Sequence, residues 1–256
     1  MGATTKDARA AAVSAATPRA IAPGDRAADR AFARLGWSEA PAIGVLGKSG
    51  TGKTEAARRL IPHYLRRCGG VAIVIDDKEP RPRYEGQCYR DPDELEGRPP
   101  APEPRVIVFR GEPSKMIGVD HEKASAYQQR LTAMGIRTVC VHDEMSDAAR
   151  YGQWKAGGES LIARQFVKGR AIGVGKIWLT QLPQFVPDEP WTQSTAILCF
   201  NVDPGTLRRL RKHRWIDERL ERTIAGLPDG NVPPNQRGYF VLLEPECASD
   251  GQIYRF

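Results

Sequence analysis

The sequence predicts an α/β protein with a mostly parallel sheet and helices on both of its faces. Short apolar runs alternate with helical patterns, and the glycine-rich stretch GKSGTGKT joins the first strand to the first helix. Parallel strands are buried on both faces and therefore form near-continuous apolar runs. In such sheets ligands bind outside the carboxyl ends of the strands, which is where reactive side chains are expected.

The predicted elements follow one another from residue 42. Strands are expected at 42–47, 71–76, 105–109, 137–142, 176–181 and 194–202, and helices at 53–67, 122–135, 160–173 and 204–224. Residues 81–104 are too rich in proline and charge for a strand and are interpreted as a long exposed loop. GYFVLLEP and QIYRF lie near an Asp250-Gly251 turn signal, so residues 238–256 are predicted to form a closing hairpin.

Composition predicts a single domain with a short appendage. Residues 1–28 lack sustained apolar periodicity and are interpreted as a flexible basic arm, whereas residues 29–256 form one domain. No window approaches the roughly eighteen apolar residues of a membrane span, so a soluble, cytoplasmic protein is expected. The five cysteines show no CxxC spacing and predict neither a zinc site nor a disulfide framework.

GKSGTGKT matches the phosphate-binding pattern G-x-x-x-x-G-K-[ST] between a buried strand and a helix. Its glycines allow backbone N–H groups to curl around phosphates at a helix N-terminus. Lys53 would reach the β and γ phosphates of ATP, and Thr54 would offer its hydroxyl to Mg²⁺. The alternative is a glycine-rich turn that merely caps a helix. The predicted nucleotide contacts are Gly47, Lys48, Ser49, Gly50, Thr51, Gly52, Lys53, Thr54 and Glu55.

Two carboxylates follow the strand predicted at 137–142. A phosphate-bound magnesium needs an oxygen ligand from a neighbouring strand end, and Asp143 is placed to provide it. Glu144 is suited to orient and deprotonate an attacking water. The alternative is that both residues cap the next segment, and Asp76 with Asp77 is a second-ranked acidic pair.

The glutamine at the end of one predicted strand and the positive net charge indicate further candidate functional residues. Gln181 could sense the γ-phosphate, although a strand-end glutamine is usually just solvated. The formal charge of +7 fits a nucleic-acid partner without establishing one. Candidate DNA contacts are Arg150, Tyr151, Trp154 and Lys155 in a glycine-containing loop, and Arg208 and Arg211 on the helix predicted at 204–224. For this helix the alternative is the solvated face of an ordinary amphipathic helix.

Four blocks in order, within residues 42–213, resemble the FtsK–HerA superfamily of DNA-pumping P-loop ATPases. They are GKSGTGKT, VIDDKEP, VCVHDEMSD and LIARQFVKGRAIGVGKIWLTQLPQFVP. The fourth block is the most specific, because many ATPases share the first and third. His142 stands where the family more often has an apolar residue, which questions how buried that strand end is.

The resemblance implies a RecA-like sheet of the additional-strand, catalytic-glutamate type and assigns roles by position. Lys53 and Thr54 would serve nucleotide and magnesium, Asp143 magnesium, Glu144 water activation and Gln181 phosphate sensing. Arg170, or Arg164 as second candidate, would be an arginine finger supplied in trans. The resemblance also implies a homo-oligomeric ring, usually a hexamer, with double-stranded DNA at its centre.

A bare motor without other domains looks most like the genome-packaging ATPases of tailless, membrane-containing viruses. On this interpretation the protein pumps DNA in the host cytoplasm or at a virion vertex and docks on a capsid or membrane portal protein. One alternative is a DNA-transfer or plasmid- or chromosome-mobilising ATPase of the same superfamily. Alternatives from other classes are a small-molecule kinase and a protein-secretion or assembly ATPase.

Overall fold

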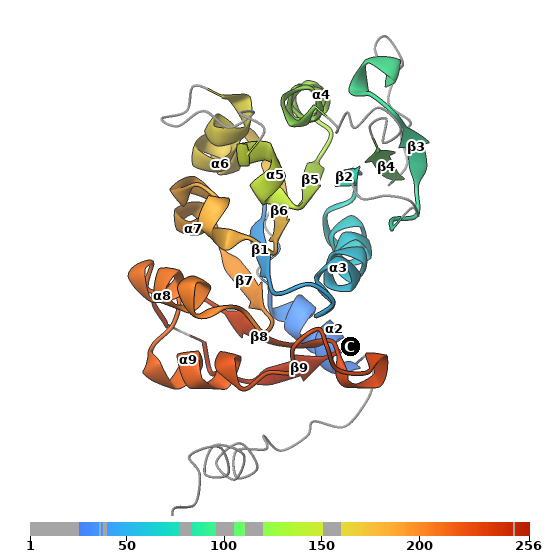
Figure 1. Cartoon of the computed structure of the whole chain (residues 1–256). Coiled ribbons are helices and arrows are strands. Elements are labelled where there is room, and N and C mark those ends of the chain that lie inside the picture. Colours follow the sequence, from blue (N-terminus) through green and yellow to red (C-terminus); the bar gives the residue numbers. More distant parts are fainter. Residues whose placement is uncertain are drawn as a thin grey trace, which may run out of the picture.

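The computed structural model describes residues 26–35, 37, 40–76, 83–95, 105–110, 120–150, 160–247 and 249–256. Within these residues nine strands form one sheet in the order β3-β4-β2-β5-β6-β1-β7-β8-β9 (Figure 1). The strands are β1 (Ala42–Leu46), β2 (Val71–Asp76), β3 (Gln87–Tyr89), β4 (Arg105–Phe109), β5 (Thr138–Asp143), β6 (Val174–Thr180), β7 (Ala196–Cys199), β8 (Tyr239–Leu243) and β9 (Ile253–Arg255). In this spatial order, all neighbouring strands from β3 through β7 pair in parallel. β8 pairs antiparallel with β7 and with β9, so β8 and β9 close the sheet as a hairpin. The predicted fold class is confirmed.

Helices cover both faces of this sheet (Figure 1). The α-helices are α2 (Arg26–Arg34), α3 (Lys53–Cys68), α4 (His121–Ala133), α5 (Met145–Arg150), α6 (Leu161–Ile172), α7 (Asp188–Gln193), α8 (Pro204–Lys212) and α9 (Glu218–Ala225). Short 3-10 helices are η1 (Pro92–Leu95), η4 (Pro183–Phe185), η5 (Pro234–Gln236) and η6 (Pro245–Cys247). One core cluster packs α2 and α3 on one face of the sheet. On the opposite face, a second cluster packs the helices α5 through α9 and a third packs α4. No helix among these has the length and apolar content that crossing a membrane requires.

The central strands contribute side chains to both cores. In β6, Ile177 and Leu179 face α3, whereas Trp178 faces the α6 side, as the two-residue period of a strand requires. Trp178 occupies space beside Gly44 of β1, where a Cβ atom would lie 2.7 Å from its ring. The Trp178 ring also meets Trp191 edge to face at 5.4 Å. The sheet therefore has dense apolar packing on both sides.

The helix predicted at 204–224 is two helices in the structure, and that prediction is wrong. α8 ends at Lys212, Arg214 adopts a positive φ of 58°, and Asp217 caps α9 by accepting a hydrogen bond from Leu220 N–H. The turn buries Trp215, which is 3% exposed and donates its indole N–H to the Trp191 carbonyl. Burying this aromatic side chain favours a turn over a continuous exposed helix.

Two segment boundaries also differ from the sequence prediction. The segment 81–104, expected to lack a strand, contains β3 at the sheet edge and η1. Helix α2 begins inside the predicted arm, and Ala28 at the end of that arm is fully buried. Residues 1–25 lie outside the described part of the chain.

Candidate functional site

The loop between β1 and α3 has the backbone shape that GKSGTGKT predicts. Gly50 and Gly52 have positive φ angles of 75° and 111°, which a residue with a side chain adopts poorly. A Cβ on Gly50 would also lie 3.0 Å from the Gly230 carbonyl oxygen. The loop is held by backbone hydrogen bonds to neighbouring segments. Lys48 N–H donates to the Asn201 carbonyl oxygen, and Gly238 N–H donates to the Thr51 carbonyl oxygen. These contacts shape a concave loop at the N-terminus of α3.

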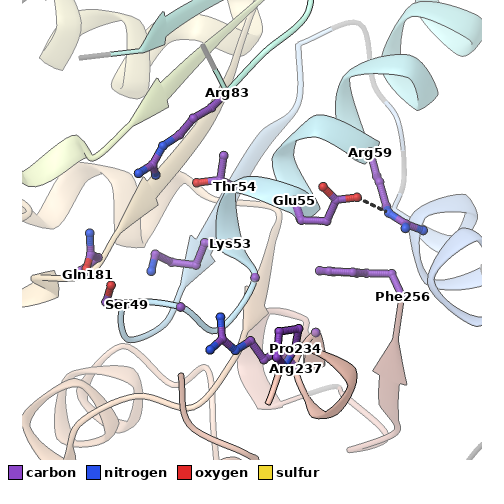
Figure 2. A pocket seen from close by; sticks show the side chains of 13 residues that line it. Ser49, Lys53, Thr54, Glu55, Arg59, Arg83, Gln181, Pro234, Arg237 and Phe256 are labelled. Atoms are coloured by element: carbon purple, nitrogen blue, oxygen red, sulfur yellow. Dashed lines mark hydrogen bonds and ion pairs between the residues drawn. The ribbon is translucent and has the colours of Figure 1, made fainter. Parts of the chain in front are cut away.

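A cavity of about 590 Å³ opens in front of this loop, at the carboxyl ends of the parallel strands (Figure 2). Its lining residues are Ser49, Gly50, Gly52, Lys53, Thr54, Glu55, Arg59, Arg83, Gln181, Pro234, Arg237, Gly238 and Phe256. Gln181 lies near the Ser49 and Lys53 end of the cavity, and Phe256 lies at the opposite end beside Arg59 (Figure 2). Of the predicted nucleotide contacts, Gly47, Lys48 and Thr51 lie outside this lining.

The ammonium group of Lys53 is folded over the loop. Its Nζ donates to the Lys48 carbonyl oxygen at 2.8 Å, and the residue is 6% exposed. Thr51 Oγ1 donates to the same carbonyl at 2.9 Å. The positive charge of Lys53 is therefore held over the loop. It adds to the partial positive charge of the N-terminus of α3, which begins at the same residue.

Asp143 lies at the end of β5, directly beside the loop. Its Oδ2 accepts hydrogen bonds from Thr54 Oγ1 at 3.2 Å and from the Tyr84 hydroxyl at 3.0 Å. Burial, with the Asp143 carboxylate as the next cause, raises the pKa of Tyr84 well above its usual value. The phenol therefore stays protonated and donates. Hydroxyl and carboxylate oxygens so close together fit the donor set that Mg²⁺ takes beside phosphates.

Glu144 has its carboxylate tied to the end of β6. Oε1 accepts from Thr180 Oγ1 at 2.7 Å, from Ser146 Oγ at 2.6 Å and from Gln181 N–H at 3.1 Å. Glu144 is 5% exposed and has a positive φ of 87°. Its carboxylate is therefore bonded to a residue that lines the cavity, Gln181, whereas Glu144 itself is not among the lining residues.

The second-ranked acidic pair has a different environment. Asp76 is the register partner of Asp143 on β2 and is 1% exposed. Its Oδ2 accepts the backbone N–H of Arg83 at 3.1 Å. Asp77 lies outside the described residues. Asp76 thus anchors the chain that returns past the cavity.

His142 lies in a buried polar cluster behind the site. It is fully buried, and its ring stacks on His121 with Nδ1 atoms 3.1 Å apart. Its Nε2 lies 3.4 Å from Nζ of the buried Lys176. Burial, followed by Lys176 and His121, lowers the pKa of His142 well below its usual value, so the ring is neutral. The strand end is buried despite its histidine.

The remaining predicted residues that the structure describes are not among the lining residues of the cavity. Arg164 and Arg170 are exposed on α6, which packs on the face of the sheet opposite α3. Arg208 is exposed on α8, and Arg211 on the same helix pairs with Glu221 at 3.1 Å. The side chain of Arg150 and the residues Tyr151, Trp154 and Lys155 lie outside the described part of the chain.

Sequence reasoning missed several residues of the site. Thr180 and Tyr84 hold the two carboxylates, and the other missed residues line the cavity: Arg59, Arg83, Pro234, Arg237, Gly238 and Phe256. One signal was available, because Tyr84 is the one aromatic residue in the charged, proline-containing run DKEPRPRYEG (77–86) after the strand ending at Asp76. An isolated aromatic residue there indicates a local anchor in the interior.

The fold and loop together define the RecA-like P-loop class of nucleotide-binding architecture. No protein-family model matches the chain, and no curated protein does so. Among solved structures, the genome packaging NTPase B204 from Sulfolobus turreted icosahedral virus 2 in complex with AMPPCP is similar, with a TM-score of 0.62 and 16% identity over 85% of this chain and 98% of that chain. The DNA-packaging ATPase B204 from Sulfolobus Turreted Icosahedral Virus matches with a TM-score of 0.59 and 15% identity over 83% and 96% of the two chains.

VirB4 of Thermoanaerobacter pseudethanolicus is more distant, with a TM-score of 0.49 and 11% identity over 84% of this chain and 88% of that chain. At these identities the two B204 proteins establish a shared fold. The predicted resemblance to DNA-pumping P-loop ATPases is thereby confirmed at the level of the fold.

Proposed function

We propose that the protein is an ATP-hydrolysing motor that translocates double-stranded DNA, with viral genome packaging as the process. The observation that carries this proposal is the convergence of one loop and two carboxylates. Asp143 contacts Thr54 of the phosphate loop, and Glu144 contacts Gln181 at the edge of the same cavity. Two viral DNA-packaging NTPases have the same fold.

The site residues divide the work of ATP hydrolysis. Lys53 exchanges the Lys48 carbonyl for phosphate oxygens, and backbone N–H groups of the loop surround the phosphates. Thr54 and Asp143 would hold Mg²⁺, which would neutralise charge that develops on the phosphates. Glu144 orients and deprotonates the attacking water, and Gln181 responds to the γ-phosphate.

Coupling of hydrolysis to DNA movement requires an assembly of subunits. Exposed arginines are the candidates for contacts between these subunits. Arg170, with Arg164 as second candidate, is exposed on α6 and would reach the nucleotide of a neighbouring subunit in a hexameric ring. Arg150, Tyr151, Trp154, Lys155, Arg208 and Arg211 remain the candidate DNA contacts. A capsid or membrane portal protein would be the docking partner, in the host cytoplasm or at a virion vertex.

The test is the ATPase rate with and without duplex DNA, together with images of the particle. We expect DNA to stimulate hydrolysis and rings to form. Glu144→Gln should retain ATP and Mg²⁺ binding but hydrolyse far more slowly, since it keeps the side-chain shape and loses the base. Phosphate transfer to a nucleoside without DNA stimulation would indicate a kinase instead. Stimulation by a protein cargo and not by DNA would indicate a secretion ATPase.

A further inference from the structure

Two successive residues of the chain between β2 and β3 are tied to two neighbouring strand ends. Arg83 donates its backbone N–H to Asp76 at 3.1 Å, and Tyr84 donates its hydroxyl to Asp143 at 3.0 Å. Asp76 and Asp143 are register partners on β2 and β5. Both acceptors are buried, and Tyr84 is 4% exposed. The backbone from which the Arg83 side chain starts is therefore held through its own N–H and through the side chain of the next residue.

The Arg83 guanidinium lies in the cavity. It lines the same space as Lys53, Thr54 and Gln181. Figure 2 shows it extending past Thr54 toward the end of the cavity where Gln181 lies. The described residues include no hydrogen-bond acceptor or ion-pair partner for this guanidinium. An exposed arginine is usually solvated, but here its own N–H is bonded to buried Asp76 and the next side chain is bonded to buried Asp143.

We propose that Arg83 binds the terminal phosphate of a nucleoside triphosphate held by the phosphate loop of the same subunit. This inference rests on the proposed function. The lysine of a phosphate loop reaches the β and γ phosphates, so on the proposed function the Lys53 and Gln181 end of the cavity would be the γ-phosphate end. A planar guanidinium can donate two parallel hydrogen bonds to phosphate oxygens, which an ammonium cannot do. Its anchored backbone reduces the conformational entropy lost on binding.

Arg83 is then distinct from the arginine expected in trans. Arg83 belongs to the subunit whose loop holds the nucleotide, whereas Arg170 and Arg164 lie on α6, on the other face of the sheet. The two kinds of arginine predict opposite results when subunits with different defects are mixed. This difference makes the proposal testable without a structure of the complex.

The first test compares binding of AMPPCP and ADP, each with Mg²⁺, to the full chain. Arg83→Ala should weaken AMPPCP binding by roughly ten-fold or more, the range for a hydrogen bond to a charged group, and change ADP binding by less than about two-fold. Arg83→Lys should recover part of the loss because it keeps the charge without the fork. Arg66→Ala is the matched control, since Arg66 is exposed on α3 and lies outside the cavity lining.

Tyr84→Phe tests the anchor, because it removes the hydroxyl and keeps the ring. It should lower the preference for AMPPCP over ADP in the same direction as Arg83→Ala, by a smaller factor. An unchanged thermal unfolding midpoint in Arg83→Ala excludes loss of folding as the cause. Equal weakening of AMPPCP and ADP by Arg83→Ala, or no weakening of either, would overturn the proposal.

The second test mixes Arg83→Ala subunits with Lys53→Ala subunits and measures hydrolysis. Both defects fall in a subunit's own site, so no mixing ratio should restore activity. Recovered activity would show that Arg83 acts across an interface and would overturn the proposal. If wild-type protein binds neither AMPPCP nor ADP, the proposed function fails together with this inference. If wild type prefers AMPPCP and Arg83→Ala keeps that preference, this inference alone fails.

Discussion

The hydroxyl of Thr180 donates a 2.7 Å hydrogen bond to Oε1 of Glu144. The last residue of β6 thus holds the carboxylate that follows β5, and the next residue, Gln181, lines the cavity. Ser146 Oγ and the Gln181 N–H also donate to the same oxygen. The position of the expected water-activating group is therefore coupled to the residue expected to sense phosphate.

We expect Thr180→Val to lower both the stability and the turnover of the protein. Valine has a similar shape and removes one donor to a buried carboxylate, so the free energy of unfolding should fall by about 1.5–3 kcal/mol. The turnover number should fall because Glu144 loses one of the contacts that fix its direction. Urea unfolding and steady-state ATPase rates measure the two effects. Thr180→Ser keeps the hydroxyl and should behave nearly as wild type, and equal damage by both variants would contradict this role.

Buried Lys176 should make stability rise with pH in the alkaline range. Its pKa is lowered from 10.5 to about 8, chiefly by burial, while Cys140 and Glu122 oppose that shift. Its Nζ lies 3.4 Å from Ser125 Oγ and 3.4 Å from the neutral His142. Between these two pKa values the unfolded chain binds more protons than the folded chain, so the Lys176 contribution to stability grows as pH rises from about 8 to 10.5.

Lys176→Met isolates this effect, because other groups also titrate in the same range. The shift corresponds to roughly 3 kcal/mol, so wild type should gain up to about that much relative to Lys176→Met between pH 7.5 and 10.5. The free energy of unfolding of both proteins, measured by urea at several pH values, gives the difference. A difference that stays constant over this range would show that Lys176 keeps its charge in the folded protein.

The parts of the fold that the sequence predicts are those with local patterns. The strands around the phosphate loop are largely apolar runs, and Asp143 and Glu144 stand at the end of one of them. The contacts that orient these carboxylates are distant in sequence: Tyr84 lies 59 residues before Asp143, and Thr180 lies 36 residues after Glu144. A side-chain pairing of this kind follows from the register of neighbouring strands, which no local pattern contains.

Edge and turn elements escape prediction for another reason. β3 has three residues and pairs with β4 alone, so it shows no alternation that distinguishes it from a loop. The apolar stripe of residues 204–224 continues through the turn between α8 and α9. The cap at Asp217 was the signal for a new helix, and the burial of Trp215 decides in favour of the turn.

The cations of α8 should contribute unequally to DNA binding. Arg209 donates to the Pro183 carbonyl and to Asp188, each at 2.7 Å, and its guanidinium lies 4.9 Å from the centre of the Trp191 ring. Arg208, in contrast, is exposed and has no ion pair among the described residues. Arg209 therefore has a role in holding η4, and Arg208 is available to a phosphate.

We expect Arg208→Ala to reduce the slope of log binding constant against log salt by about 0.9, the value for one phosphate contact. Arg209→Ala should leave this slope unchanged and lower the free energy of unfolding by about 1–3 kcal/mol. Duplex DNA binding over a series of salt concentrations and urea unfolding provide the two measurements. A change of slope in Arg209→Ala without one in Arg208→Ala would reverse the assignment of the two residues.

Arg170 offers the test of a site shared between subunits. It is exposed at the end of α6 and lies outside the cavity lining, so it cannot serve its own nucleotide from this position. As an arginine finger in trans it would stabilise charge on a neighbour's γ-phosphate, and Arg170→Ala should lower turnover by about 10³-fold or more. Lys168→Ala, a change of an exposed cation on the same helix, is the control and should have little effect.

Mixing Arg170→Ala with Lys53→Ala subunits then decides where Arg170 acts. A Lys53→Ala subunit still carries Arg170 and can supply it to the intact loop of an Arg170→Ala neighbour, so part of the activity should return. Arg164→Ala, mixed in the same way, determines which of the two arginines has this role. Failure to recover activity at any ratio, in particles that still form rings, would place the function of Arg170 outside the shared site. Arg83 would then remain as the candidate guanidinium for the γ-phosphate. Arg83 is proposed to act within its own subunit, so a mixture of Arg83→Ala and Lys53→Ala subunits is expected to recover no activity.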